Sequence, residues 1–296
     1  MPATSPFGRL LSAMVTPLHA DGSVDLDAAQ RLAAHLVDAG HDGLVVNGTT
    51  GESPTTTDAE KADLVRAVVE AVGDRARVTA GTGTNDTAHT IELTRAAVAA
   101  GADGVLLVTP YYNKPPQAGI RAHFTAVADA ADVPVMLYDI PGRSGVPITT
   151  ESLIALAAHP AITAVKDAKG DLWAATEVMS ATDLLWYAGD DAAALSHLTQ
   201  GAHGLVGVTT QVAPTVYADL FAALDAGDLA SALATHRRLV PLVNAVMNLT
   251  QGAISAKAAL RELGILESAT VRLPLVGATD DEVVALRAAL EGLDLL

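Results

Sequence analysis

The feature that most constrains this chain is a regular alternation of short apolar runs with longer alanine-rich segments. The runs are apolar on successive residues and rich in Val and Ile, as expected for parallel strands that are covered on both faces. Eight such runs occur, at residues 11–16, 43–47, 77–81, 104–109, 135–138, 162–166, 184–188 and 204–209.

The segments between the runs have apolar residues at helical spacing. Two of them stop at glycines, Gly40 and Gly101, which is typical of a helix C-terminus. They span residues 25–39, 58–72, 87–100, 117–130, 149–158, 172–181, 191–199 and 214–226. Eight strands, each followed by a helix, predict an α/β fold, a (β/α)8 TIM barrel. The alternative is an open doubly wound sheet, which usually has fewer strands and a glycine-rich turn after the first.

The strand pattern ends at about Gly227. Three further helices are predicted, at residues 229–249, 253–263 and 280–290. We therefore divide the chain into a (β/α)8 catalytic barrel, residues 1–227, and a small C-terminal all-helical appendage, residues 228–296. That appendage is small for an independent domain.

Composition and charge narrow the class of protein. Among 296 residues there are 18 basic and 34 acidic side chains, giving a net charge of −16, and there is no cysteine. Such a charge repels nucleic-acid backbones and anionic lipid, so neither partner is expected. The absence of cysteine excludes disulfides, thiolate catalysis and zinc–thiolate sites. No run approaches the roughly 20 apolar residues of a membrane span, and we expect a cytoplasmic enzyme.

The carboxyl ends of the predicted strands mark the candidate active site, because TIM barrels carry their chemistry at that face. Of five lysines, Lys166 alone ends an apolar strand. Desolvation in a barrel mouth would lower its pKa and free the amine to attack a carbonyl. The alternative is a structural lysine paired with Asp167 or Asp139.

Tyrosines at neighbouring strand ends favour the catalytic interpretation. Tyr138 and Tyr112 could carry protons during formation and tautomerisation of a Schiff base, with the hydroxyl of Thr49 between them. A tyrosine at a strand end is, taken singly, more often a packing residue. The catalytic role of Lys166 thus depends on these groups converging.

Two further segments suit an anionic substrate. Thr49 and Thr50 lie in a Gly-Thr-Thr-Gly turn whose amides and hydroxyls could bind a carboxylate, although an ordinary hydroxyl-rich turn explains the same residues. Arg143 follows the fifth strand, where its guanidinium could bind a second carboxylate. Surface arginines are common, so this position alone is weak support. Gly189, at the end of the seventh strand, is predicted to join the substrate-binding site.

No signature of a metal or cofactor site is present. The nine histidines include no HxH or HExxH spacing, and Asp191 is interpreted as a helix N-cap. The sequence also lacks a P-loop and the GxSxG nucleophile elbow. We expect neither a cofactor nor a metal.

The motifs in this order resemble those of the dihydrodipicolinate synthase family, in the pyruvate-dependent class I aldolase superfamily that includes N-acetylneuraminate lyase. The resemblance covers nearly the whole chain, from Ala13 to Pro274. It is carried by Ala-Met-Val-Thr-Pro at 13–17, Gly-Thr-Thr-Gly-Glu-Ser at 48–53, Val-Thr-Pro-Tyr-Tyr at 108–112, Tyr-Asp-Ile-Pro-Gly-Arg-Ser-Gly at 138–145, Val-Lys-Asp-Ala at 165–168 and Gly-Asp-Asp at 189–191.

The resemblance implies a lyase in diaminopimelate and lysine biosynthesis that condenses pyruvate with L-aspartate 4-semialdehyde to give 4-hydroxy-tetrahydrodipicolinate. Lys166 would form the imine with pyruvate, and Tyr138, Thr49 and Tyr112 would form the proton relay. Tyr112 would come from a neighbouring subunit of a homotetramer built as a dimer of dimers.

Substrate-binding residues also follow from the resemblance. Thr50 and the adjacent amides would bind the pyruvate carboxylate, and the backbone of Val206 would line the pocket. Arg143 would bind the carboxylate of the aldehyde.

The chain departs from the family at its lysine feedback site. Lysine-sensitive relatives have His, His and Glu where this chain has Asp58, Lys61 and His89, while Ser53, Asn85 and Tyr111 are kept. A cationic ligand would lose a carboxylate and meet Lys61. We therefore expect weak or absent inhibition by lysine.

Two other functions remain open at this point. The first is another Schiff-base aldolase, an N-acetylneuraminate lyase or a 2-keto-3-deoxy sugar acid aldolase, although those relatives generally lack an arginine at position 143. The second is a catalytically inactive barrel that acts as a sensor or scaffold, which loss of the lysine or the tyrosines would signal. Both residue types are intact.

Overall fold

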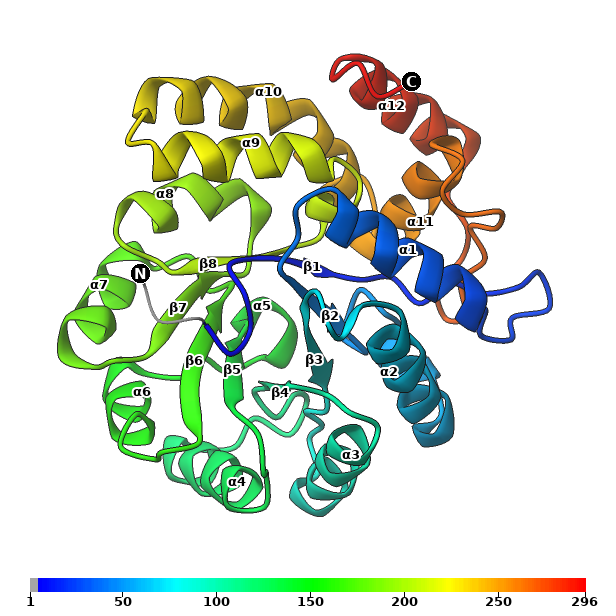
Figure 1. Cartoon of the computed structure of the whole chain (residues 1–296). Helices are drawn as coiled ribbons and strands as arrows, with labels where there is room; N and C mark the ends of the chain where they lie inside the picture. The colour runs from blue at the N-terminus through cyan, green and yellow to red at the C-terminus, as the bar shows by residue number, and fades with distance from the viewer. Residues whose placement is uncertain (1–4) are drawn as a thin grey trace.

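The computed structural model describes residues 5–296, and its strands close into a barrel in sequence order. All eight neighbouring pairs are parallel, including β1 with β8. Figure 1 shows helices surrounding this barrel. The strands are β1 (Leu10–Ala13), β2 (Gly43–Val46), β3 (Arg77–Gly81), β4 (Gly104–Val108), β5 (Val135–Asp139), β6 (Ile162–Asp167), β7 (Leu185–Ala188) and β8 (Gly204–Gly207). The prediction of a (β/α)8 barrel is confirmed.

The helices follow the strands as expected. They are α1 (Leu26–Asp38), α2 (Asp58–Val72), α3 (Thr87–Ala99), α4 (Gln117–Asp129), α5 (Pro141–Ser144), α6 (Thr150–Leu156), α7 (Leu172–Ala181), α8 (Ala194–Thr199) and α9 (Pro214–Asp225), with short 3-10 turns η1 (Ser53–Thr55), η2 (Asp191–Ala193) and η3 (Thr209–Gln211). The one-turn helix α5 was not predicted, because four residues that start with proline are too few to show a helical period.

Three C-terminal helices, α10 (Leu229–Met247), α11 (Gly252–Glu262) and α12 (Asp280–Glu291), pack beside α9 and α1 (Figure 1). Their apolar side chains, among them Leu242 and Leu260, belong to the same buried cluster as Leu11 and Leu32 of the barrel. The barrel and these helices therefore share one hydrophobic core. The division near Gly227 remains an interpretation of the sequence.

Within residues 5–296, no single helix is long and apolar enough to cross a bilayer. Helices α10 and α11 reach that length and composition only when taken together, as a pair bent by 114°.

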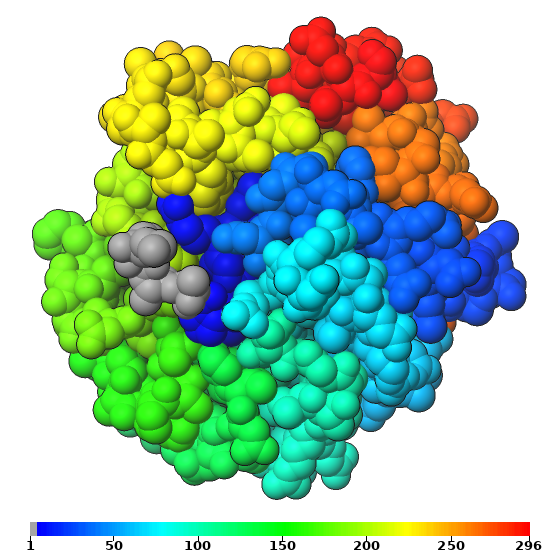
Figure 2. Space-filling model, in the orientation of Figure 1, coloured from blue at the N-terminus to red at the C-terminus, as the bar shows by residue number. Residues whose placement is uncertain are grey.

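The N-terminal end of the barrel is closed by the segment before β1. Phe7 is fully buried, and a β-carbon on Gly43 or Gly104 would collide with its backbone or ring. Figure 2 shows this segment, in dark blue, filling the centre of the face that points toward the viewer. Substrates must therefore enter from the opposite end.

A β-bulge in β6 sets the direction of its last side chains. Val135 pairs with Ile162 but Met136 pairs with Ala164, so Thr163 is an extra residue. After the bulge, Ala164 faces the barrel interior with Met136, and Val165 packs in the outer cluster with Leu137. Lys166, one position further, therefore points into the barrel beside Tyr138.

Candidate functional site

A cavity of about 500 Å³ lies at the C-terminal mouth of the barrel. Its walls come from the loops that follow β2 to β7, from Val208 after β8, and from the end of α10. Seven of the predicted site residues line it: Thr49, Thr50, Tyr112, Tyr138, Arg143, Lys166 and Gly189. The strand-end rule thus brings together side chains that are separated by up to 140 positions in the sequence.

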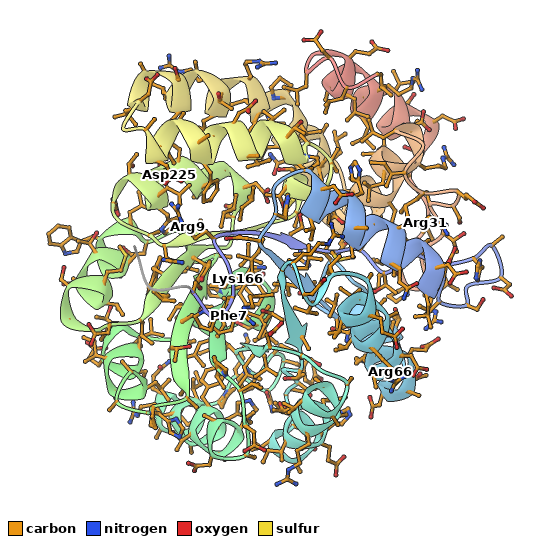
Figure 3. All side chains as sticks on the ribbon, viewed as in Figure 1. Phe7, Arg9, Arg31, Arg66, Lys166 and Asp225 are labelled. Carbon is orange, nitrogen blue, oxygen red and sulfur yellow. The ribbon has the colours of Figure 1, made fainter. Side chains whose placement is uncertain are left out.

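Lys166 lies near the barrel axis (Figure 3) and is only 4% exposed. Burial lowers its pKa from 10.5 to about 8; the carboxylate of Asp191 opposes this shift, and the charge of Arg143 adds to it. Within residues 5–296 its amino group has no carboxylate partner at ion-pair distance, whereas Lys169 lies 3.6 Å from Asp139 and Lys257 pairs with Glu52. Within those residues, Lys166 therefore forms no ion pair with Asp139 or Asp167, and the structural alternative is excluded.

Tyr138 packs directly against this lysine. The two residues are register partners on β5 and β6, and the amino nitrogen lies 4.3 Å from the centre of the phenol ring. Burial raises the pKa of Tyr138 to about 12, so its hydroxyl is protonated at neutral pH and can donate a proton. Tyr187, the partner of Lys166 on β7, instead sends its hydroxyl to the carbonyl of Gly8 at 2.7 Å, at the closed end.

Gly189 gives Lys166 the space it needs. A β-carbon at this position would lie 2.9 Å from Cγ of Lys166 and 3.0 Å from the backbone of Asp167. Any side chain here would displace the stem of the lysine. Gly189 therefore contributes close packing around the amine as well as a wall of the cavity.

The turn of residues 48–53 presents free backbone donors to the cavity. The amides of Gly51 and Glu52 donate to the carbonyls of Gly48 and Thr49 at 3.0 and 3.1 Å. Within the described chain, the amides of Thr49 and Thr50 donate to no protein acceptor. Two adjacent free N–H groups in a turn are suited to a carboxylate oxygen.

Arg143 reaches the cavity from α5, a single helical turn that starts at Pro141, ends at Ser144 and is capped by Gly145, whose φ is +80°. The arginine is exposed and within electrostatic reach of both Lys166 and Tyr138, since its charge lowers the pKa of each. A guanidinium in this position can bind an anionic substrate near the amine of Lys166 without filling the space in front of that amine.

Tyr112 lies at the rim of the cavity and is 88% exposed, with a φ of +73° that is unusual for a residue with a side chain. Across residues 5–296, no hydrogen bond joins the hydroxyls of Tyr112, Thr49 and Tyr138. Catalytic hydrogen bonds often form only in the substrate complex, so the relay stays a prediction.

The structure refines two details of the sequence interpretation. Val206 is fully buried on β8, and Val208, two residues nearer the mouth, lines the cavity; a role for the backbone of Val206 beside pyruvate stays a prediction. Asp191 is not the N-cap; Asp190 caps η2 by accepting from the amide of Ala192 at 3.0 Å.

Asp191 has a different task that the sequence did not reveal. It is buried and accepts hydrogen bonds from the amide of Val208 at 3.0 Å and from the amide and hydroxyl of Thr209 at 3.0 and 2.6 Å. The hydroxyl of Tyr217 lies 3.4 Å from the same carboxylate. Asp191 thus fixes the end of β8 and lies within electrostatic reach of Lys166, whose pKa it raises.

The cavity wall also includes Met247 and Asn248 at the end of α10. Neither carries a motif, and no periodicity could have assigned them to the site. In the part of the chain that the structure describes, no three His, Asp or Glu side chains are grouped as metal ligands.

Comparisons with known proteins agree with this geometry. A model of the dihydrodipicolinate synthetase family matches residues 6–293. The chain belongs to that family. It is 61% identical to 4-hydroxy-tetrahydrodipicolinate synthase of Kineococcus radiotolerans over 97% of this chain and 94% of the relative, and 59% identical to 4-hydroxy-tetrahydrodipicolinate synthase 2 of Streptomyces coelicolor over 96% and 94%.

Among solved structures, the dihydrodipicolinate synthase of Cyanidioschyzon merolae with lysine bound superposes with a TM-score of 0.95 at 43% identity, covering 98% of this chain and 99% of the other. The barrel and the C-terminal helices are thus those of the dihydrodipicolinate synthetase family. The resemblance noted in the sequence is confirmed.

The pKa of Lys166 gives a first prediction. Because only the neutral amine attacks a carbonyl, the rate of imine formation with pyruvate should rise about tenfold per pH unit below pH 7 and level off above about pH 8. Asp191 raises the pKa of Lys166, so Asp191→Asn should move the midpoint to lower pH. The rate of borohydride-trappable adduct against pH measures both. Asp38→Asn, which breaks an exposed ion pair with Arg75, is the control and should leave the midpoint unchanged. An unchanged or raised midpoint in Asp191→Asn would contradict the electrostatic effect assigned to Asp191.

Proposed function

We propose that this chain is a 4-hydroxy-tetrahydrodipicolinate synthase, which condenses pyruvate with L-aspartate 4-semialdehyde. The observation that carries the proposal is the buried Lys166 amine, with its pKa lowered to about 8, facing a cavity beside Tyr138. The names of relatives at 59 and 61% identity support the same reaction.

The chemistry begins at Lys166. Its amine adds to the C2 carbonyl of pyruvate, and loss of water, to which Tyr138 delivers the proton, leaves an imine. Removal of a proton from C3 gives an enamine, which forms a C–C bond to the aldehyde carbon of the semialdehyde. The amino group of that substrate then adds to C2 and releases Lys166, which closes the ring.

Binding of the two substrates is divided between two anion sites. The free amides of Thr49 and Thr50, with the hydroxyl of Thr50, would hold the carboxylate of pyruvate. Arg143 would hold the carboxylate of the semialdehyde. A second candidate, a sugar-acid aldolase, has no comparable use for Arg143, and a chain without catalysis would have no need for a desolvated lysine.

We also propose a homotetramer built as a dimer of dimers. The support is Tyr112, whose ring is 88% exposed at the cavity rim. An aromatic side chain left in solvent beside an active site is well suited to completing the site of a second copy. Tyr112 would then close the proton relay with Tyr138 and Thr49 from the neighbouring subunit. The reaction needs no cofactor, because the imine itself serves as the electron sink.

The test of the proposal is reduction with borohydride in the presence of pyruvate, followed by peptide mass spectrometry. We expect one pyruvyl adduct per chain, on Lys166, and none in Lys166→Arg. Lys169→Arg is the matched control, since that lysine lies three residues away but pairs with Asp139, and it should be labelled normally. An adduct on any other lysine, or on none, would overturn the mechanism.

The role of Arg143 gives a prediction about the second substrate. Arg143→Gln should lower kcat/KM for L-aspartate 4-semialdehyde by about 10- to 100-fold, because a charge-assisted hydrogen bond to a carboxylate contributes about 1.5–3 kcal/mol. Loss of the Arg143 charge should raise the pKa of Lys166 above about 8, so pyruvate trapping is compared at about pH 10, where the amine is mostly neutral in both proteins, and should remain within about threefold. Arg121→Gln, which loses a 3.0 Å hydrogen bond from α4 to Ser152 of α6 and does not line the cavity, is the control. An equal loss for both substrates would contradict an aldehyde-specific role, and N-acetylmannosamine as the better aldehyde would favour the alternative aldolase.

The feedback site gives a further prediction. The carboxylate of Asp58 lies 2.9 Å from Nε2 of His89 and 3.9 Å from the amine of Lys61, and Lys61 donates to the carbonyl of Thr56 at 2.5 Å. The one carboxylate in this cluster is therefore already engaged, and a cationic ligand would meet Lys61. Millimolar L-lysine should leave turnover nearly unchanged, and the combined Asp58→His, Lys61→His, His89→Glu variant should be more sensitive. Abolition of wild-type turnover by millimolar lysine would contradict this.

A further inference from the structure

A buried ion pair joins the candidate carboxylate-binding turn to the C-terminal helices. Glu52 lies in that turn, residues 48–53, and is 3% exposed, and Lys257 of α11 is fully buried. The lysine amine pairs with one oxygen of Glu52 and also donates to the carbonyl of Thr270 at 2.8 Å. The second oxygen accepts from the amide of Arg272 at 2.8 Å. Neither Glu52 nor Lys257 lines the cavity.

The backbone of Glu52 needs such an anchor. Its φ of 55° and ψ of 36° lie in the left-handed region, which a residue with a side chain adopts only when its surroundings impose it. In this conformation its amide donates to the carbonyl of Thr49 at 3.1 Å. Because Lys257 holds Glu52, and Glu52 is bonded to Thr49, the ion pair also sets the direction of the free amides of Thr49 and Thr50.

The same C-terminal segment fixes the far side of the turn. The guanidinium of Arg272 binds both carboxylate oxygens of Glu60, at 2.8 and 2.5 Å, and the carbonyl of Thr55 at 2.8 Å. This contact lowers the pKa of Glu60 to about 2. Residues 52–60 are thus held along their length by side chains and backbone from α11 and the segment after it.

We propose that Glu52 and Lys257 are positioning residues for pyruvate, which hold the 48–53 turn so that its free amides face the carbon skeleton bound to Lys166. The C-terminal region then acts on the first substrate although its buried lysine touches no substrate atom. This inference rests on the proposed function, because it assigns the turn to the carboxylate of pyruvate. A purely structural ion pair would change stability alone.

The experiment compares Glu52→Gln and Lys257→Met with the wild type in the full-length protein. Borohydride trapping over a range of pyruvate concentrations gives the half-saturating concentration, and steady-state assays give KM for the aldehyde and kcat. We expect the half-saturating pyruvate concentration to rise about 10- to 100-fold. A displacement of binding groups by about 1 Å lowers rates and affinities by factors of this order. KM for the aldehyde should stay within about threefold.

Val178→Ala is the matched control for stability. It removes methyl groups from a fully buried residue of α7, in the outer cluster away from the turn. It should lower Tm without changing the half-saturating pyruvate concentration. If Glu52→Gln lowers Tm and likewise leaves pyruvate capture unchanged, the ion pair is structural and the proposal is overturned.

The double variant Glu52→Gln, Lys257→Met separates charge burial from positioning. Removing one partner leaves an unpaired buried charge, whereas removing both is much less destabilising. The double variant should therefore recover Tm but not pyruvate capture; recovery of both together would overturn the proposal. If the wild type itself forms no adduct on Lys166, the proposed function fails instead, so the two failures are distinguishable.

Discussion

Desolvation of a single lysine amine is the constraint on which the rest of this structure depends. An ammonium group loses its hydration when it is buried. No carboxylate of residues 5–296 lies at ion-pair distance from Lys166 to compensate, so the neutral form is favoured. Burial requires a closed barrel, a sealed N-terminal end at Phe7 and a glycine at position 189. The bulge at Thr163 then turns the lysine inward. Packing that is remote from the chemistry therefore creates the nucleophile.

The charges around Lys166 are balanced rather than uniformly repulsive. Arg143 lowers the pKa of the lysine, and Asp191 raises it while also fixing the end of β8. A protein with a net charge of −16 needs local cations to attract an anionic substrate. Arg143 supplies one at the rim, and the free amides of Thr49 and Thr50 supply neutral donors deeper in the cavity. This arrangement attracts carboxylates without adding a positive charge directly beside the amine.

The barrel and most of the cavity could be predicted because they follow from local patterns. Continuous apolar runs predict buried parallel strands, and the strand-end rule then groups Lys166 with Tyr138 and Arg143. What the sequence could not reveal depends on contacts between distant segments. Asp191 looks like a cap in a local window, and its bonds to the end of β8 appear only when the barrel closes. Lys257 lies in an alanine-rich stretch whose local pattern predicts only a helix, and its pairing with Glu52, 205 positions away, exists only in the folded chain.

The most direct test of the central claim is a crystal structure of the protein soaked with pyruvate at about pH 8. We predict continuous electron density from Nζ of Lys166 to C2 of pyruvate, with the carboxylate on the amides of Thr49 and Thr50. The phenol of Tyr138 should lie beside the imine carbon. Pyruvate bound without a covalent link would contradict the role of Lys166, and a pyruvate carboxylate on Arg143 instead of the turn would contradict the assignment of the two anion sites.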